Sequence, residues 1–258
     1  MTKRAVLFDL DDTLIIEEAA AAAAFHATAA VAARSYEVDA DRLAAAVRDN
    51  ARDLWRTTPV HGYCLEIGVS SWEGLWCEFL GDDLPTRWLR HWAPDYRVEA
   101  WHLALIDLGI HDHALAQTLG EVYPRERRAR HQLFPDAIEC LTRLRDTYHL
   151  GVVTNGAPCL QREKLSASGL AEFFDTIVVS GDIGVGKPDP RIYLEALLRL
   201  QVTEAVMVGD SIRRDVEGAM AAGLRAIWLN RDARRENLGL PHVTTLVDVP
   251  ARVVELAQ

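Results

Sequence analysis

The strongest constraint on the fold is a repeated alternation of short apolar runs and helix-like stretches. The apolar runs are residues 5–8, 150–153, 176–179, 205–208 and 226–229, with a weaker run at 243–247. Stretches with helical patterning lie between the later runs, at residues 137–147, 158–168, 190–200 and 212–222. Strands followed by helices predict a parallel sheet with helices on both faces and a ligand site beyond the carboxyl ends of the strands. We therefore expect an α/β fold with a Rossmann-like parallel-sheet core.

The first apolar run stands apart from this rhythm. Residues 9–149 separate it from the second run, far more than one crossover helix requires. An inserted domain explains the gap, and its segments look helical at residues 17–34, 39–56, 71–80 and 85–108, with Asp39 and either Ser70 or Ser71 as N-caps. Six of the seven tryptophans fall there, at spacings more typical of a helical core than of a ligand platform. We expect a catalytic core of residues 1–15 and 132–258 and an all-helical cap of residues 16–131.

Charge and hydropathy exclude several classes of partner. The 258 residues carry 28 basic and 38 acidic side chains, a formal net charge of −10, which argues against a nucleic acid or an anionic lipid surface. The alanine run at 19–24 is bracketed by charged residues, which suits a soluble helix and not a membrane span. The first residues reach Asp9 before any apolar stretch of signal-peptide length. The sequence therefore predicts a cytoplasmic protein with no nucleic-acid or membrane partner.

The cysteines give no sign of a metal or redox site. They are far apart and form no C-x-x-C pair, at Cys64, Cys77, Cys140 and Cys159. We expect reduced and mostly buried thiols.

An acidic cluster directly follows the first predicted strand, in the run Asp9-Leu10-Asp11-Asp12-Thr13. A carboxylate at the end of a strand, with a second one two residues on, can bind a divalent cation and still present a nucleophile. Here the sequence resembles the haloacid dehalogenase (HAD) superfamily, whose D-x-D-x-T loop occupies this place. Three further motifs extend the resemblance along the whole core.

Two of these motifs concern the phosphoryl group. Thr154-Asn155-Gly156 ends the second strand and matches the family's Ser/Thr position, where a hydroxyl and nearby backbone N–H groups would bind a phosphoryl oxygen. Lys187 lies in the run Gly-Lys-Pro-Asp-Pro at 186–190. The family places this lysine on the phosphoryl group and the nucleophilic aspartate, where its charge offsets theirs.

The last motif supplies more carboxylates. Gly209-Asp210, followed by Asp215, fits the family's G-D-x-x-x-x-D pattern after a strand. The resemblance implies that Asp210 is a metal ligand, whereas Asp215 either binds the metal directly or contacts a residue that does. It also implies that the insertion is a C1-type cap, a small helical bundle that closes over the site.

Each motif alone has a plain structural explanation. Asp9 and Asp11 could be turn aspartates, Thr154 a strand-end hydroxyl, Lys187 a surface lysine and Asp210 a helix N-cap. The order, spacing and placement of all four motifs favour the functional interpretation.

The neighbouring residues are assigned smaller roles. We interpret Asp12 as a solvated loop or cap residue, and we expect Thr13 to orient Asp11. Asn155 and Gly156 contribute either contacts to substrate or turn chemistry alone.

The resemblance implies phosphoryl transfer in two in-line steps. Asp9 attacks phosphorus while Asp11 protonates the leaving oxygen as general acid, and water then hydrolyses the aspartyl-phosphate with Asp11 as general base. Mg²⁺ held by Asp9, the Asp11 carbonyl oxygen and Asp210, with Lys187 alongside, would neutralise the gathering negative charge. We therefore expect a Mg²⁺-dependent phosphomonoester hydrolase that acts on a small phosphorylated metabolite, such as a sugar phosphate or a nucleotide.

Single residues distinguish the other activities of the superfamily from a phosphatase. Dehalogenases lack the second aspartate, because no leaving oxygen needs a proton, so Asp11 favours phosphate esters. Phosphonate hydrolases use a cap lysine, but the chain's lysines are Lys3, Lys164 and Lys187, all outside the insertion. A phosphomutase would keep all four motifs and stays an alternative. A non-catalytic binding module should have lost at least one essential group, and none is missing.

The sequence specifies neither the leaving group nor the oligomeric state. Polar and aromatic residues near predicted helix ends of the cap are candidates for leaving-group contact, although surface or cap-core roles are the more ordinary interpretation: Arg56, His61, Tyr63, Trp72 and Arg87.

Overall fold

The computed structural model describes residues 4–231 and 239–257, and its contacts divide the chain into two compact units. The first unit comprises Met1–Ile16, Gln132–Gly156 and Gln161–Gln258, and the second comprises Glu17–His131 and Ala157–Leu160. The expected division kept residues 157–160 with the core. The structure groups them with the second unit because Ala157 and Leu160 pack into its apolar cluster.

A six-stranded parallel sheet forms the centre of the first unit, in the order β3-β2-β1-β4-β5-β6. The strands are β1 (Ala5–Phe8), β2 (His149–Thr154), β3 (Thr176–Val179), β4 (Ala205–Gly209), β5 (Arg225–Leu229) and β6 (His242–Val243). The predicted α/β Rossmann-like core is confirmed. The weak run expected at 243–247 is a strand only at β6, after which the chain enters the 3₁₀ turn η3 (Leu246–Asp248).

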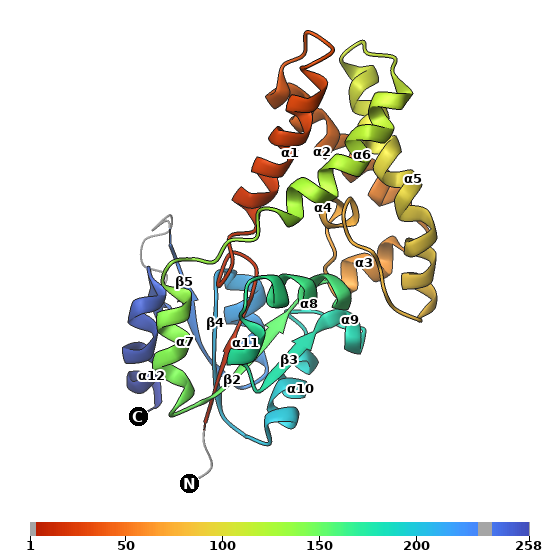
Figure 1. Ribbon diagram of the computed structural model, residues 1–258. Coiled ribbons are helices and arrows are strands. Elements are labelled where there is room, and N and C mark those ends of the chain that lie inside the picture. The colour runs from red at the N-terminus through yellow and green to blue at the C-terminus, as the bar shows by residue number, and fades with distance from the viewer. Residues whose placement is uncertain (1–3, 232–238, 258) are drawn as a thin grey trace. The chain divides into compact units, whose positions relative to one another are not determined.

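Helices cover both faces of this sheet (Figure 1). Val6 and Phe8 of β1 pack toward the face that carries α7 (Ala137–Arg145) and α12 (Val249–Ala257). Leu7 packs on the opposite face, with α10 (Pro190–Leu200) and α11 (Gly218–Ala221). The strands are apolar on both sides because neither face meets water.

The strand order reverses at β1, which pairs with β2 on one side and β4 on the other. In open parallel sheets, loops diverge at such a switch point and leave a crevice beyond the carboxyl ends of the strands. The acidic cluster follows β1, Thr154 ends β2, and Asp210 follows β4. The topology thus brings together residues as far apart in sequence as Asp9 and Asp210.

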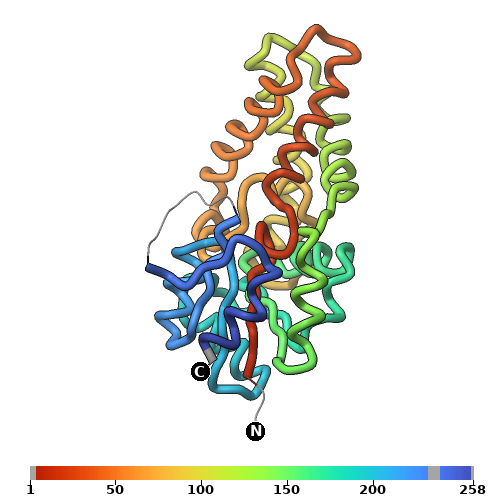
Figure 2. The backbone as a smooth tube through the Cα atoms, turned by 90° about the vertical axis from the view of Figure 1, so that its left-hand side faces the viewer, coloured from red at the N-terminus to blue at the C-terminus, as the bar shows by residue number. Residues whose placement is uncertain are grey.

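The second unit is built on four long helices that run alongside one another, α1 (Glu18–Ala32), α2 (Ala40–Thr57), α5 (Leu84–Asp107) and α6 (His113–Arg128) (Figure 2). The shorter helices α3 (His61–Ile67) and α4 (Ser71–Gly74) complete it. Phe25 stacks on Tyr123 with ring centroids 4.4 Å apart, and Trp101 is fully buried beside them. These aromatic residues form core, as expected.

Local capping matches the sequence signals at two of these helices. The Asp39 carboxylate accepts hydrogen bonds from the N–H groups of Asp41 and Arg42, and Ser70 forms a reciprocal capping box with Glu73. Both predicted N-caps, Asp39 and Ser70, are confirmed. Among the described residues, no helix is both long enough and apolar enough to cross a membrane.

The helix expected at 71–80 is wrong beyond Gly74. Phe79 adopts a left-handed backbone with φ of 50°, which interrupts a helix. Arg97 donates to the carbonyl oxygen of Cys77 at 2.6 Å, and Arg90 donates to that of Phe79 at 3.0 Å and to that of Gly81. These guanidinium groups of α5 satisfy carbonyls that a helix would otherwise use. Helices α3 and α6 were not anticipated.

Candidate active site

The first carboxylate of the site comes directly from the sheet. Asp9 continues the β1 ladder, because its N–H donates to the carbonyl oxygen of Val208 in β4 at 2.9 Å. Its residue surface is only 7% exposed. This backbone anchor places the Asp9 carboxylate at the carboxyl end of the sheet, between β2 and β4.

A buried lysine meets this carboxylate. Lys187 Nζ lies 2.5 Å from Asp9 Oδ1 and 2.7 Å from Asp215 Oδ1. Burial by itself would lower the pKa of Lys187, but the charges of Asp215 and Asp9 outweigh it and raise that pKa above its usual range. Lys187 is therefore a permanent cation in the site, and the surface-lysine interpretation does not hold.

Asp215 reaches the site because the helix after β4 opens with a π-helical turn, η2 (Ile212–Glu217). The Asp215 carboxylate uses one oxygen for Lys187 and accepts the Ser211 N–H on the other at 2.9 Å. Gly209 makes room for it, since a Cβ there would lie 2.3 Å from the Asp215 carboxyl carbon. Wide helical turns of this kind are frequent at functional sites.

Three carboxylates converge at this place. One oxygen from each of Asp9, Asp210 and Asp215 lies within 4.8 Å of the other two. Burial raises the pKa of Asp9 to about 8 although Lys187 acts in the opposite direction. Asp210 keeps exposed surface, yet the protein packed around its carboxyl group, and then the charge of Asp215, raise its pKa to about 7. The single positive charge of Lys187 does not neutralise the three carboxyl groups when they are ionised.

The donor set fits a hard divalent cation. Magnesium prefers carboxylate and carbonyl oxygens, and the cluster offers oxygens with surplus negative charge. Asp210 is the most accessible of the three carboxylates, because it keeps exposed surface. Both Asp9 and Asp215 already bind Lys187, and their second oxygens accept hydrogen bonds from Thr13 and Ser211.

The Thr-Asn-Gly corner at the end of β2 holds the backbone of Lys187. Asn155 pairs with the backbone of Lys187 in both directions: its Nδ2 donates to the Lys187 carbonyl oxygen at 3.0 Å, and its Oδ1 accepts the Lys187 N–H at 2.7 Å. Gly156 has φ of 143°, which favours glycine, and its N–H donates to Ser180 Oγ. Thr154 is buried at the end of β2.

Two residues of α8 (Pro158–Ala167) were missed from the sequence. Lys164 Nζ lies 3.0 and 3.1 Å from the two carboxylate oxygens of Asp11, and the lysine is fully buried. Gln161 Nε2 donates to Asp11 Oδ2 at 2.9 Å and to Thr154 Oγ1 at 2.6 Å. The sequence offered one hint, which is that lysine is rare in this chain. Lys164 is one of three lysines, and only Lys164 and Lys187 lie within the described residues.

The Thr13 hydroxyl contacts Asp9 and Asp210, whereas Asp11 was its expected partner. The hydroxyl donates to Asp9 Oδ2 at 3.3 Å and accepts the Asp210 N–H at 3.2 Å. Thr13 therefore joins the ends of β1 and β4, while Gln161 and Lys164 orient Asp11. Asp12 adopts a left-handed backbone with φ of 57° in the loop, a conformation that aspartate tolerates better than most residues.

The candidate cap residues belong to the second unit, and most of them have partners there: Arg56, His61, Tyr63, Trp72 and Arg87. Arg56 pairs with Asp53 at 3.3 Å, and the Tyr63 hydroxyl lies 3.3 Å from Thr86 Oγ1. The Arg48 guanidinium lies over the Trp72 ring, with its central carbon 5.1 Å from the ring centroid. Arg87 is exposed.

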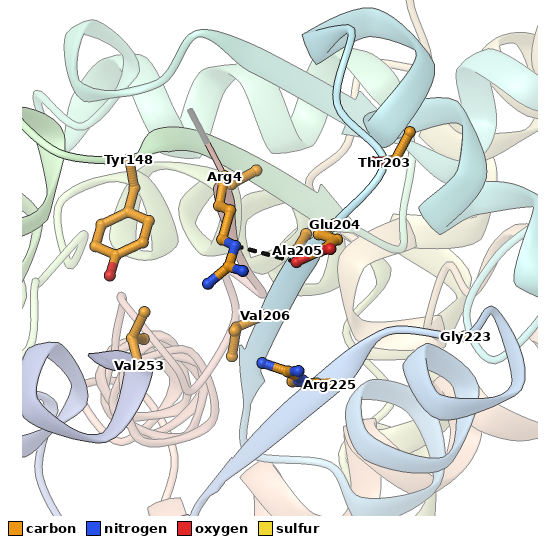
Figure 3. A pocket seen from close by; sticks show the side chains of 10 residues that line it. Arg4, Tyr148, Thr203, Glu204, Ala205, Val206, Gly223, Arg225 and Val253 are labelled. Carbon is orange, nitrogen blue, oxygen red and sulfur yellow. Dashed lines mark ion pairs between the residues drawn. The ribbon is translucent and has the colours of Figure 1, made fainter. Parts of the chain in front are cut away.

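A separate cavity lies at the amino ends of the strands, opposite the candidate active site (Figure 3). It has a volume of about 260 Å³ and is lined by residues at the amino ends of β1, β4 and β5, including Arg4, Glu204 and Arg225. Arg4 and Glu204 form an ion pair of 3.0 Å across its rim. None of the motif residues lines this cavity, so it is distinct from the candidate active site.

The chain is similar in sequence to known hydrolases. The sequence profile of the haloacid dehalogenase-like hydrolases matches residues 3–223. Phosphoserine phosphatase of Thermus thermophilus is 37% identical over 235 residues, which are 90% of each chain.

Among solved structures, the 2-haloacid dehalogenase of Pseudomonas syringae superposes with a TM-score of 0.63 at 27% identity, covering 98% of this chain and 99% of that one. The HAD hydrolase YfnB of Bacillus subtilis, described as bound to magnesium, superposes with a TM-score of 0.65 at 24% identity, covering 98% and 100%. The chain belongs to the haloacid dehalogenase-like hydrolase family.

Proposed function

We propose that the protein is a Mg²⁺-dependent phosphomonoester hydrolase that works through an aspartyl-phosphate on Asp9. The observation that carries this proposal is the convergence of the Asp9, Asp210 and Asp215 carboxylates around one buried ammonium, that of Lys187. Such a site has surplus negative charge until a divalent cation binds, and it then suits the binding of a phosphoryl dianion.

Asp9 is the nucleophile in this proposal. Lys187 holds one of its carboxylate oxygens and Thr13 holds the other, which fixes the orientation of the carboxylate. Asn155 in turn holds the backbone of Lys187 from both sides. The reacting carboxylate and its cation are therefore positioned before substrate arrives, which removes part of the entropic barrier of the first step.

Asp11 is the general acid and then the general base. Gln161 and Lys164 act as positioning residues, because they bind its carboxylate from α8. Gln161 also donates to Thr154. One amide therefore orients both the Asp11 carboxylate and the hydroxyl proposed to bind phosphate. Bound Mg²⁺, held by Asp9, the Asp11 carbonyl oxygen and Asp210, would neutralise phosphoryl charge. Asp215 is a positioning residue for Lys187.

The substrate class is a small phosphate monoester. The similarity to a phosphoserine phosphatase over 90% of the chain adds a phospho-amino acid to the sugar phosphates and nucleotides that the motifs suggest. A phosphatase is favoured over a haloacid dehalogenase because Asp11, with its buried lysine and glutamine partners, has no role in chemistry without a leaving oxygen.

The test is phosphate release from para-nitrophenyl phosphate with Mg²⁺, followed by a panel of phosphoserine, sugar phosphates and nucleoside monophosphates. Asp9→Asn should lower turnover at least about 10³-fold because it removes the nucleophile. Asp12→Asn is the matched control in the same loop, and it should keep most of the activity because asparagine also tolerates a left-handed backbone.

Three results would contradict the proposal. They are phosphate release that survives Asp9→Asn, release that is unchanged by a chelator of divalent cations, and chloride release from 2-chloropropionate by a protein inert on the whole phosphate panel. Trapping of a phosphorylated enzyme whose label maps to Asp9 would support it directly.

A further inference from the structure

Two cysteines that are 82 positions apart lie against each other in the second unit. Cys77 Sγ and Cys159 Sγ are 3.7 Å apart, and both residues belong to the same compact unit. Cys77 is buried, whereas Cys159 is half-buried in the first turn of α8. The sequence spacing did not indicate that these two residues are neighbours, and both are free thiols in the structure, as expected.

The surroundings of the two sulfur atoms differ. Cys159 Sγ accepts the Leu80 N–H at 3.3 Å, and Cys77 Sγ accepts the Phe79 N–H at 3.4 Å. The hydrogen bond from Cys77, with backbone N–H groups of Leu80 and Leu160, lowers the pKa of Cys159 to about 6 against the effect of burial. Burial raises the pKa of Cys77 well above its usual range. Cys159 is therefore the cysteine that ionises more readily, and Cys77 is the one that keeps its proton to higher pH.

We propose that Cys77 and Cys159 form a reversible intramolecular disulfide when the protein meets a peroxide. The Cys159 thiolate attacks one peroxide oxygen, the O–O bond breaks, and the leaving hydroxide takes a proton to become water. The sulfur of Cys77 then attacks the Cys159 sulfenic acid. The S–S bond forms, the S–O bond breaks, and the thiol proton leaves with the hydroxide as a second water. Two thiols lose two electrons, and one peroxide is reduced to two waters.

The geometry leaves little movement to be made. The two sulfur atoms must approach from 3.7 Å to about 2.05 Å. On one side, the segment 77–81 is held by the hydrogen bonds from Arg90 and Arg97 to its carbonyls. The other side is the first turn of a helix, whose N-terminus favours the thiolate that starts the reaction.

The bond would also act on the candidate active site. Gln161 follows Cys159 by two residues and donates to both Asp11 and Thr154. A displacement of the first turn of α8 by about 1 Å would disturb these hydrogen bonds, and misplacements of that size cost up to about a hundredfold in rate. This consequence rests on the proposed phosphatase function, whereas the disulfide itself does not.

The experiment treats the reduced full-length protein with a few equivalents of hydrogen peroxide, blocks the remaining thiols, and maps the peptides by mass spectrometry. The expected result is a mass decrease of about 2 Da before blocking, two blocked thiols in place of four afterwards, and one linked peptide that contains Cys77 and Cys159. Dithiothreitol should restore the original mass and thiol count. The Cys64→Ala/Cys140→Ala variant should behave in the same way with two thiols falling to none.

Cys77→Ala should form no linked peptide and should instead accumulate sulfenic or sulfinic acid on Cys159. Its fold is checked by circular dichroism, and the wild-type peptide map stands even if this variant does not fold. A wild-type map in which Cys159 is oxidised while Cys77 stays a thiol, or in which neither reacts, would overturn the proposal.

Turnover of para-nitrophenyl phosphate is measured on the same samples. We expect a loss of about tenfold or more on oxidation and full recovery with dithiothreitol. A linked peptide with unchanged turnover would refute the coupling to Gln161 but not the disulfide. A reduced enzyme inert on every phosphate ester would refute the proposed function, while the peptide map would still decide the disulfide.

Discussion

Magnesium should bind this protein more tightly as the pH rises from about 6 to about 8. Without metal, the pKa of Asp9 is about 8 and that of Asp210 about 7, so both carboxylates hold protons at neutral pH for part of the time. The cation needs them ionised, and its binding must therefore displace protons. Affinity then depends on pH even though the ion itself does not titrate.

The size of the effect follows from these two values. Each pH unit below the pKa of Asp9 costs about 1.4 kcal/mol for its deprotonation, a tenfold loss of apparent affinity. Below about pH 7, Asp210 takes up a proton as well, and the loss approaches a hundredfold per unit. A raised carboxyl pKa stabilises the metal-free protein at low pH, and this contribution is lost as the pH rises through that pKa. Both effects favour the metal-bound form at higher pH.

Isothermal titration calorimetry with MgCl₂ measures the effect directly. Runs in buffers of different ionisation enthalpy count the protons released, and we expect about one per ion near pH 7.5 and more at pH 6. In Asp210→Asn, the apparent affinity for Mg²⁺ should fall by only about tenfold per pH unit below pH 7. A dissociation constant that stays level between pH 6 and 8, with no proton released, would show that Asp9 is already ionised without metal and would refute this reasoning.

Lys164→Met keeps an unbranched side chain, one atom shorter, and removes the ammonium group. It should lower turnover about a hundredfold by releasing the proposed general acid, while the circular dichroism spectrum stays native. An unchanged rate would show that Lys164 has no role in the site. Gly209→Ala should lower the melting temperature and the activity because its Cβ would meet a carboxyl carbon at 2.3 Å, whereas Gly62→Ala, with nothing within 4 Å, should do neither. Arg127→Met should destabilise the protein by about 3 kcal/mol in urea titrations, because it removes the buried ion pair between Arg127 and Glu17. Glu17→Gln in the Arg127→Met background should recover part of that loss; a lack of recovery would point to packing of the arginine over Trp76 instead.

The sequence alone determined the order of strands and helices in the core and the chemical type of each motif residue. Apolar runs and helical periodicity are local properties of the chain, so the bounds of β1 and β3 match the predicted strands to the residue. Parallel strands put their carboxyl ends at one edge, so the meeting of Asp9, Lys187 and Asp210 followed from topology.

Only the tertiary structure decided which partners surround those residues. Lys164 binds Asp11 across 153 positions, and Cys77 meets Cys159 across 82, and neither pairing leaves a local pattern in the chain. The end of α4 at Gly74 was likewise set from a distance, by arginines of α5 that bind the carbonyls of the following segment. Such contacts depend on how side chains pack between elements, whereas periodicity and spacing record only which elements form.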